Sequence, residues 1–251
     1  MKTKIELAGD SWNPVTGCNP CSEGCRNCYA KRIAARFWGE RKFSDIILHY
    51  DRLQNPKFIK KPAIIFVNSM SDLFHDKVPF EFVDQVNDVM EECLHQHQFI
   101  ILTKRVDRME EYVKRRRFSN NVALGASIET QEMADLRLPV LLRTHAACRI
   151  ASIEPMLEMI NIREYVIGGQ PRKHPELPGL DAVFCGGETG PGCRIPPSPN
   201  EIRSLRDTCR AAGVTFFLKQ MWGEKMPVLD GKVWDEFPEF GPAIIRRNIG
   251  Y

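Results

Sequence analysis

The sequence has no long apolar run, no apolar leader and little net charge. It holds no stretch of roughly eighteen uncharged apolar residues, so we expect no membrane-spanning segment. Residues 1–7 lack the apolar core of a signal peptide, which predicts a cytoplasmic location. The formal charge of +3 is too small to indicate a nucleic-acid partner on its own. Together these absences favour a globular chain without a membrane partner.

Length and composition are those of an ordinary folded chain. The 251 residues are 43% hydrophobic and 27% charged, which is too apolar for a disordered protein. By length alone, two small domains or one α/β barrel fit equally well. The pattern of elements described next favours a single domain over residues 1–251.

Short apolar runs alternate with amphipathic stretches through residues 62–223. The runs predicted to be buried strands are residues 63–67, 99–102, 122–126, 149–151, 182–185 and 214–218. The stretches with a helical period are residues 80–97, 106–117, 131–143 and 200–212. Continuous apolar strands joined by helices indicate a parallel sheet buried on both faces. We therefore predict an α/β fold with a single (β/α) barrel of TIM type, partial, with about six to seven βα units over residues 63–223. An open doubly wound sheet is the alternative.

Two regions interrupt this alternation. Residues 155–179 are rich in proline, glycine and charge, above all from Gly168 to Pro175, and we predict an insertion loop there. Residues 224–251 carry turn signals at Asp230-Gly231 and Gly241-Pro242 and are expected to form an irregular C-terminal cap.

Polar side chains follow the predicted strands. They are Ser69, Asp72, Lys104, Arg105, Ser127, Glu129, Ser152, Glu154, Glu188, Lys219 and Gln220. In a parallel barrel these positions meet at the C-terminal mouth, where such folds place their active sites. Strand ends are also polar because they meet solvent, but that reason explains poorly why carboxylates, amines and amides recur around the mouth. We therefore predict the active site at this mouth.

Four of the nine cysteines lie within residues 12–30, a short segment rich in turn residues. Nine is an odd count and a reducing compartment disfavours disulfides, so the cysteines are expected to be metal ligands, catalytic thiols or buried small hydrophobic residues. The loop has little apolar content in which to bury its four thiols, which favours metal ligands there. Thiolates are soft donors suited to zinc or to iron–sulfur centres. Only three residues separate Cys21 from Cys25, which is more typical of a cluster-binding loop than of paired zinc knuckles. The cysteines predicted to be buried core residues are Cys93, Cys148, Cys185 and Cys209.

The spacing Cys21-x-x-x-Cys25-x-x-Cys28 matches the three-cysteine motif of radical S-adenosylmethionine enzymes. Along nearly its whole length the chain resembles the phage-associated three-cysteine-motif family, whose members are related to those enzymes. The matching stretches are residues 12–30, 67–75, 102–105, 153–157, 186–192, 216–223 and 229–238. The resemblance implies that the metal ligands fall on Cys18, Cys25 and Cys28. Cys21 stands where family members usually carry an apolar residue, so Cys21 could replace Cys18 in the trio or add a fourth ligand; we favour Cys18.

The resemblance implies a [4Fe–4S] cluster and S-adenosyl-L-methionine as cofactors, with the N-terminal cysteine loop at the C-terminal mouth. In the radical superfamily a Gly-Gly-Glu element near the second strand contacts the methionyl amino group. Here Gly186-Gly187-Glu188 follows a later strand, so that role does not transfer by position. We assign the ammonium to Asp72 instead, with Ser69 beside it.

The remaining mouth residues divide between cofactor and substrate. Lys104 or Arg105 is expected to pair with the methionyl carboxylate. Glu129 and Glu154 are candidates for the ribose hydroxyls or for the substrate. The residues predicted to be catalytic, on the substrate side, are Glu188, Lys219 and Gln220.

Two functions remain open at this point. The first is a radical enzyme, in which the reduced cluster cleaves adenosylmethionine to a 5′-deoxyadenosyl radical that modifies an unknown substrate. A nucleic acid or nucleotide is the first substrate class to test, and a partner protein is a further expectation. The alternative is an iron–sulfur or zinc protein that binds nucleic acid without radical chemistry. Its signals are the basic run at residues 114–117, also explained by a helix C-terminus, and Arg36, Arg41 and Lys42.

Overall fold

The computed structural model describes residues 8–166, 177–194 and 197–242. The Gly- and Pro-rich stretch 168–175 and the end of the predicted cap, 243–251, lie outside the described residues. Among the helices described, none combines the length and apolar content that crossing a bilayer needs.

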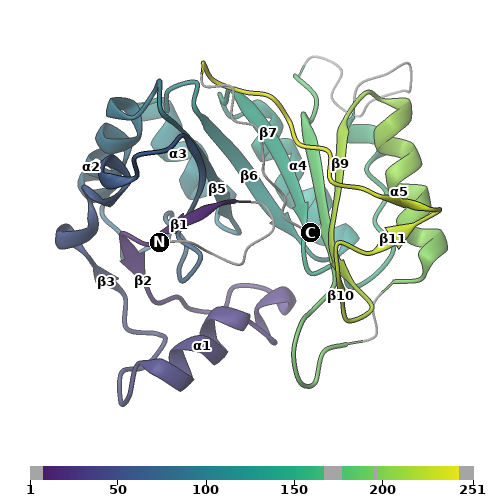
Figure 1. The fold of residues 1–251 in the computed structure, drawn as a ribbon, viewed down its shortest axis with the longest axis horizontal. Helices are drawn as coiled ribbons and strands as arrows, with labels where there is room; N and C mark the ends of the chain where they lie inside the picture. Colours follow the sequence, from purple (N-terminus) through teal and green to yellow (C-terminus); the bar gives the residue numbers. More distant parts are fainter. Residues whose placement is uncertain (1–7, 167–176, 195–196, 243–251) are drawn as a thin grey trace.

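One eight-stranded sheet organises the molecule (Figure 1). In spatial order its strands are β1 (Asp10–Trp12), β4 (Ala63–Val67), β5 (His97–Thr103), β6 (Val122–Ile128), β7 (Cys148–Ile153), β8 (Ala182–Gly186), β9 (Thr215–Met221) and β10 (Glu224–Lys225). The strands from β1 to β9 are parallel, and β10 runs antiparallel to β9. Sheet order follows chain order, as expected for consecutive βα units.

The sheet curls into a half-barrel and does not close in the described part of the chain. Its edges are β1, with three residues, and β10, with two, and each is hydrogen-bonded to one neighbour only. The α/β class and the partial barrel are therefore confirmed, and the doubly wound alternative is wrong. A complete TIM barrel would need β1 and β10 to pair, whereas they are the two ends of the strand order.

Helices cover the outer face of the curled sheet (Figure 1). They are α2 (Phe80–Glu92), α3 (Val106–Arg115), α4 (Gln131–Arg143) and α5 (Pro199–Ala211). Strand side chains alternate between two cores: Ile65 and Val67 pack with the helices, whereas Ile64 and Phe66 face the inner side. The inner core contains no helix residue and is covered in part by the C-terminal segment through Phe240. The sheet is thus buried on both faces, but helices bury only one.

The predicted elements recur with small shifts. The strand at 63–67 and the helix at 131–143 are confirmed at both ends, and Pro139 lies inside α4 without ending it. The helix predicted to reach residue 97 ends at Glu92, because His97 already begins β5. α5 begins behind the Ser198 capping box.

The segment between β1 and β4 was only partly predicted. It contains β2 (Val15–Thr16), the cysteines, α1 (Tyr29–Phe37) and β3 (Ile47–Leu48). β1 adds one parallel strand ahead of residues 63–223, so the cysteine loop is the connection that follows the first strand. The small elements that complete the chain are the 3₁₀ turns Glu23–Cys25, Tyr50–Arg52, Asn55–Phe58 and Arg163–Tyr165, and the hairpin β11 (Val228–Leu229) with β12 (Lys232–Val233).

Candidate functional site

A cavity of about 580 Å³ opens at the carboxyl ends of the parallel strands. Its walls include Ser69 and Asp72 after β4, Lys104 and Arg105 after β5, and Glu154 after β7. Ser127, Ser152, Glu188, Lys219 and Gln220 also line it. The structure therefore brings together all but one of the strand-end residues singled out in the sequence.

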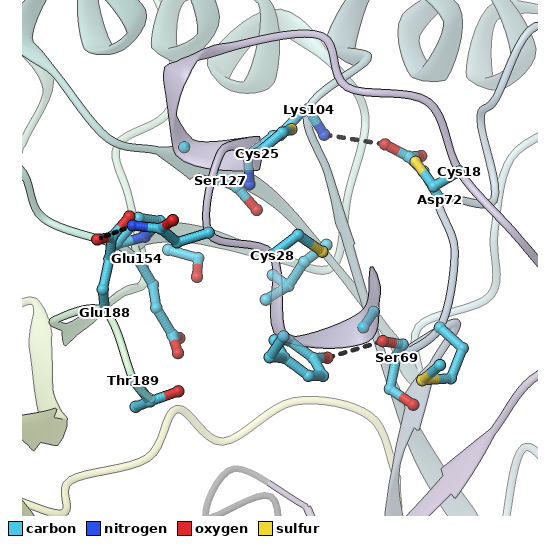
Figure 2. Close-up of a pocket in the computed structure, with 18 of the residues that line it drawn as sticks. Cys18, Cys25, Cys28, Ser69, Asp72, Lys104, Ser127, Glu154, Glu188 and Thr189 are labelled. Atoms are coloured by element: carbon cyan, nitrogen blue, oxygen red, sulfur yellow. Dashed lines mark hydrogen bonds between the residues drawn. The ribbon is translucent and has the colours of Figure 1, made fainter. Parts of the chain in front are cut away.

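The four cysteines of the loop line the same cavity. Cys18, Cys25 and Cys28 are half-buried and Cys21 is exposed. In Figure 2, Cys28 lies between Glu154 on one side and Ser69 on the other. The four cysteines predicted to be core residues are all buried, as expected. The loop thiols are thus separated from the core and presented to the cavity.

The loop thiols differ in their tendency to ionise. A hydrogen bond from the Cys21 thiol lowers the pKa of Cys25 to about 5, and the nearby Lys104 ammonium acts in the same direction. Burial raises the pKa of Cys18 to about 11, with the Asp72 carboxylate adding to the effect. Among the described residues, no three cysteine, histidine or carboxylate side chains converge closely enough to hold an ion. The donor set nevertheless fits a thiophilic metal or cluster, since four thiols face one cavity beside two cationic side chains.

Arg105 and Asp72 join the end of β5 to the cysteine loop. Arg105 Nη1 lies 3.1 Å from Asp72 Oδ2 and 3.7 Å from Cys18 Sγ, and its Nη2 donates to the Asn19 carbonyl at 3.0 Å. The two side chains are only 11% and 8% exposed. Asp72 also accepts from Thr103 Oγ1, and from the Phe74 and Lys104 amides. With four donors on its two oxygens, Asp72 is arranged to hold Arg105, and its assignment to the ammonium remains a prediction.

Glu188 forms a second connection to the cysteine loop. Its carboxylate accepts hydrogen bonds from Asn27 Nδ2 at 2.9 Å and from the Arg194 amide at 2.8 Å. The Arg194 guanidinium bonds Glu188 and reaches Glu23 Oε1 at 2.8 Å. Desolvation opposes ionisation of Glu188, but the bonds from Arg194 prevail and lower its pKa to about 2. Glu188 therefore lines the cavity as a paired anion.

Glu154, Lys219 and Gln220 form a polar cluster on the cavity wall. Glu154 Oε1 lies 2.5 Å from Lys219 Nζ and 2.8 Å from Gln220 Nε2. Burial would raise the pKa of Glu154, yet the Lys219 ammonium and the Gln220 amide hold it below its usual value. Lys219 and Gln220 were predicted to be catalytic, and the structure places both against Glu154.

Glu129 is the strand-end residue that does not line the cavity. It is fully buried, and its Oε2 lies 2.8 Å from Arg137 Nη1. A Cβ at Gly24 would lie 3.1 Å from its Cδ, so the Glu129 side chain packs behind the cysteine loop. Glu129 therefore does not line the cavity, and its role toward a ribose or the substrate remains a prediction.

Other contacts at the site were not predicted. Asn27 and Arg194 both donate hydrogen bonds to Glu188. No sequence pattern marks Arg194, whereas the position of Asn27 between Cys25 and Cys28 was a signal that could have identified it. Asn68 has a left-handed backbone (φ 60) and accepts from the Val15 amide at 3.3 Å. Its Nδ2 is buried without an acceptor in the described part of the chain, on a residue that lines the cavity. Asn68 therefore offers an amide donor to a ligand.

The basic run at residues 114–117 lies on the outer side, at the end of α3. Arg115 lies 2.6 Å from Asp84 and Arg116 lies 2.6 Å from Asp88, so α2 supplies carboxylates to two of its four cations. Lys114 pairs with Glu110 at 3.3 Å. The run is thus largely neutralised within the fold.

Three solved structures of spore photoproduct lyase mutants are similar to this chain at low identity. One mutant matches with a TM-score of 0.43 and 14% identity over 84% of this chain and 74% of its own. Another, with bound AdoMet and dinucleoside spore photoproduct, matches with a TM-score of 0.44 and 12% identity over the same shares.

The comparison with protein families is more decisive. No curated protein matches the chain significantly. A family model described as "Protein of unknown function (DUF5131)" matches residues 2–238, nearly the entire sequence. The chain therefore belongs to the DUF5131 family, whose function is unknown.

Proposed function

We propose that this protein is a radical enzyme that holds an iron–sulfur cluster and S-adenosyl-L-methionine in the strand-end cavity and modifies a substrate there. The observation that carries the proposal is the placement of four loop cysteines around a cavity lined by ionic and amide side chains. Thiols that are half-exposed contribute little to a hydrophobic core, whereas an iron–sulfur cluster is held by several cysteine thiolates close together.

Cys18, Cys25 and Cys28 are the proposed cluster ligands, and Cys21 is the residue that could replace Cys18 or add a fourth thiol. When bound, a reduced cluster would supply one electron to adenosylmethionine, and its C5′–S bond would break to give methionine and a 5′-deoxyadenosyl radical. Arg105 holds the loop in place through the Asn19 carbonyl, and its charge favours the ionised form of nearby thiols.

Other cavity residues are assigned to binding. Lys104 pairs with the carboxylate of the methionyl group, and Asn68 Nδ2 donates to it or to a neighbouring oxygen. Because four donors already surround Asp72, we assign the ammonium of adenosylmethionine to other oxygen atoms that line the cavity. Ser69 is assigned to the cofactor site because it lines the cavity beside Tyr29. The Tyr29 hydroxyl donates to the Ser69 carbonyl at 2.7 Å.

Lys219 and Gln220 act on the substrate side. Glu154 pairs with Lys219 and orients it, so that Nζ can bind an anionic group of the substrate or donate a proton to it. Phe66 and Leu102 add apolar surface to the cavity wall. Glu188 is assigned to positioning the cysteine loop rather than to proton transfer.

The test is anaerobic reconstitution with iron and sulfide, followed by reduction and addition of adenosylmethionine. We expect a reduced-cluster EPR signal that shifts with adenosylmethionine, together with release of 5′-deoxyadenosine. Cys25→Ser should abolish cluster assembly, whereas Cys193→Ser, an exposed cysteine outside the set, should not. Comparing Cys18→Ser with Cys21→Ser identifies the third ligand. A chain that assembles no cluster, or a cluster without response to adenosylmethionine, would refute the proposal.

The alternative of a metal protein that binds nucleic acid without radical chemistry has less support, because its main basic run is paired with carboxylates of α2. Cytoplasmic location, association with phages and a partner protein remain predictions.

A further inference from the structure

Helix α1, which follows the cysteine loop, exposes an apolar stripe. Tyr29, Ile33 and Phe37 are spaced four residues apart and are 41%, 42% and 68% exposed. Only Ala30 and Ala34 of this helix are buried. Tyr29 and Ile33 also line the strand-end cavity. The stripe therefore starts at the cavity and continues over the surface for roughly 12 Å, at 1.5 Å per helical residue.

Cationic side chains accompany this stripe. Residues 26–42 contain six lysines and arginines and one acidic residue, Glu40, although the whole chain carries only +3. Arg26, Lys31 and Arg32 line a second cavity of about 260 Å³, with no carboxylate among the described residues of its lining. Arg26 lies 3.5 Å from Glu23 Oε1 and the Arg32 guanidinium donates to the Thr189 carbonyl, whereas Lys31 and Arg36 form no ion pair with a described residue.

The two rows of side chains match a polymer with one anionic edge and one aromatic edge. Phosphates bind lysine and arginine, and unpaired bases stack on aromatic and apolar side chains. The Arg36 guanidinium lies 5.2 Å from the Phe37 ring, so charge and ring are already adjacent on α1. An acidic protein segment would satisfy the cations, but it offers no regular row of flat rings for the stripe.

We propose that α1 binds a single-stranded nucleic acid, with phosphates along Arg26, Lys31 and Arg32 and bases against the Tyr29–Ile33–Phe37 stripe. The strand then passes the mouth of the cavity, and one nucleotide can enter it beside Tyr29. That this nucleotide is the substrate rests on the proposed function, whereas binding by α1 does not.

The experiment measures fluorescence anisotropy of labelled oligomers of about twelve nucleotides, within the usual site size of such proteins. Single-stranded DNA, single-stranded RNA and duplex DNA are titrated with anaerobically purified protein of measured iron content, without reductant or adenosylmethionine. We expect single strands to bind more tightly than the duplex, with affinity falling steeply between about 50 and 200 mM salt. The DNA and RNA arms identify which strand is preferred.

Two variants separate charge from stacking. The double change Lys31→Glu and Arg32→Glu should weaken binding by roughly tenfold or more and reduce the salt slope by about one to two. Phe37→Ser should weaken it by roughly tenfold without changing the slope. The matched control, Lys114→Glu with Arg117→Glu, makes the same charge change on α3 and should leave binding within about twofold.

Equal loss in the control pair, or tighter binding to the duplex, would overturn the inference. Absence of oligonucleotide binding would also overturn the inference. If the native chain then elutes as a larger assembly, the stripe would be assigned to a contact between protein chains. Because binding needs neither reductant nor adenosylmethionine, a protein that forms an active cluster but binds no strand refutes only this inference. A protein that binds strands without assembling a cluster refutes only the proposed function.

Discussion

Glu188 is a buried carboxylate that connects the end of β8 to the cysteine loop. Its side chain is 4% exposed, and bonds from Arg194 prevail over desolvation to lower its pKa to about 2. A carboxylate whose folded-state pKa is depressed stabilises the fold above its unfolded-state pKa, near 4.5. That stabilisation disappears as the pH falls through the folded-state value.

Replacing Glu188 by Gln should therefore destabilise the protein at pH 7 by on the order of 1–2 kcal/mol, since the Arg194 side of the pair is partly solvent-screened. The difference from the native chain should shrink between about pH 4.5 and 2 and vanish below that range. Urea unfolding at several pH values measures it. Arg194→Met removes the same pair and should show the same pH profile; a pH-independent difference would contradict the assignment.

Arg105 connects the end of β5 to the cysteine loop through the Asn19 carbonyl. Arg105→Met should leave Asp72 buried without its partner and free the Asn19 carbonyl, so residues 18–28 should lose protection in hydrogen exchange. We also expect several-fold lower iron content after reconstitution. Arg116→Met, which removes a paired arginine from the outer side of α3, is the control. Unchanged exchange in the loop of the Arg105 variant would show that other contacts hold it.

Strand β6 passes its neighbours unusually closely at Gly125. A Cβ at this position would lie 2.8 Å from the Ile150 carbonyl of β7 and would also press on the Leu102 side chain of β5. Because backbone cannot move aside cheaply, Gly125→Ala should destabilise the protein by about 1–3 kcal/mol in urea unfolding. Gly9→Ala has nothing within 4 Å of the new Cβ and should change stability by less than about 0.5 kcal/mol. A neutral Gly125→Ala would mean that the strands separate easily.

Helix α5 depends on its first turn. Ser198 accepts from the Glu201 amide, and the Glu201 carboxylate in turn accepts from the Ser198 amide at 2.7 Å. Ser198→Ala should therefore cost about 1 kcal/mol of unfolding free energy, while Ser198→Asp should retain most of it. Equal losses in both variants would argue that the cap contributes little.

The half-barrel is covered at its two ends by different parts of the chain. The cysteine loop covers the carboxyl ends of the strands. The C-terminal segment covers the inner core, where Phe237 stacks on Phe184 at 5.6 Å and Gln98 Nε2 donates to the Phe240 carbonyl. Stability and the proposed chemistry are therefore located in separate regions.

Phe240→Ala should destabilise the whole protein by about 3 kcal/mol, because it removes a ring that is 7% exposed from the inner core. Iron content and oligonucleotide binding of the folded variant should be unchanged. Phe37→Ala, at 68% exposure, should instead leave stability within about 0.5 kcal/mol. Loss of iron from folded Phe240→Ala would show that the two ends are coupled.

Several features of the fold were predictable from local pattern. The apolar run at 63–67 and the helical periods at 131–143 and 200–212 were predicted to within one residue, because each depends on neighbouring residues. β1 was missed because three residues cannot show a period, and its pairing with β4 is set by contacts about 55 residues away.

The location of the site also follows from chain order, whereas the state of its carboxylates does not. Parallel strands in consecutive order bring their polar ends to one mouth, and the cysteines follow the first strand, so the amino-acid order suffices to place thiols and strand ends together. Asp72, Glu129 and Glu188 look equally available in the sequence. Folding pairs them with Arg105, Arg137 and Arg194, and a carboxylate buried beside an arginine holds the structure in place because separating the pair would leave a buried charge uncompensated.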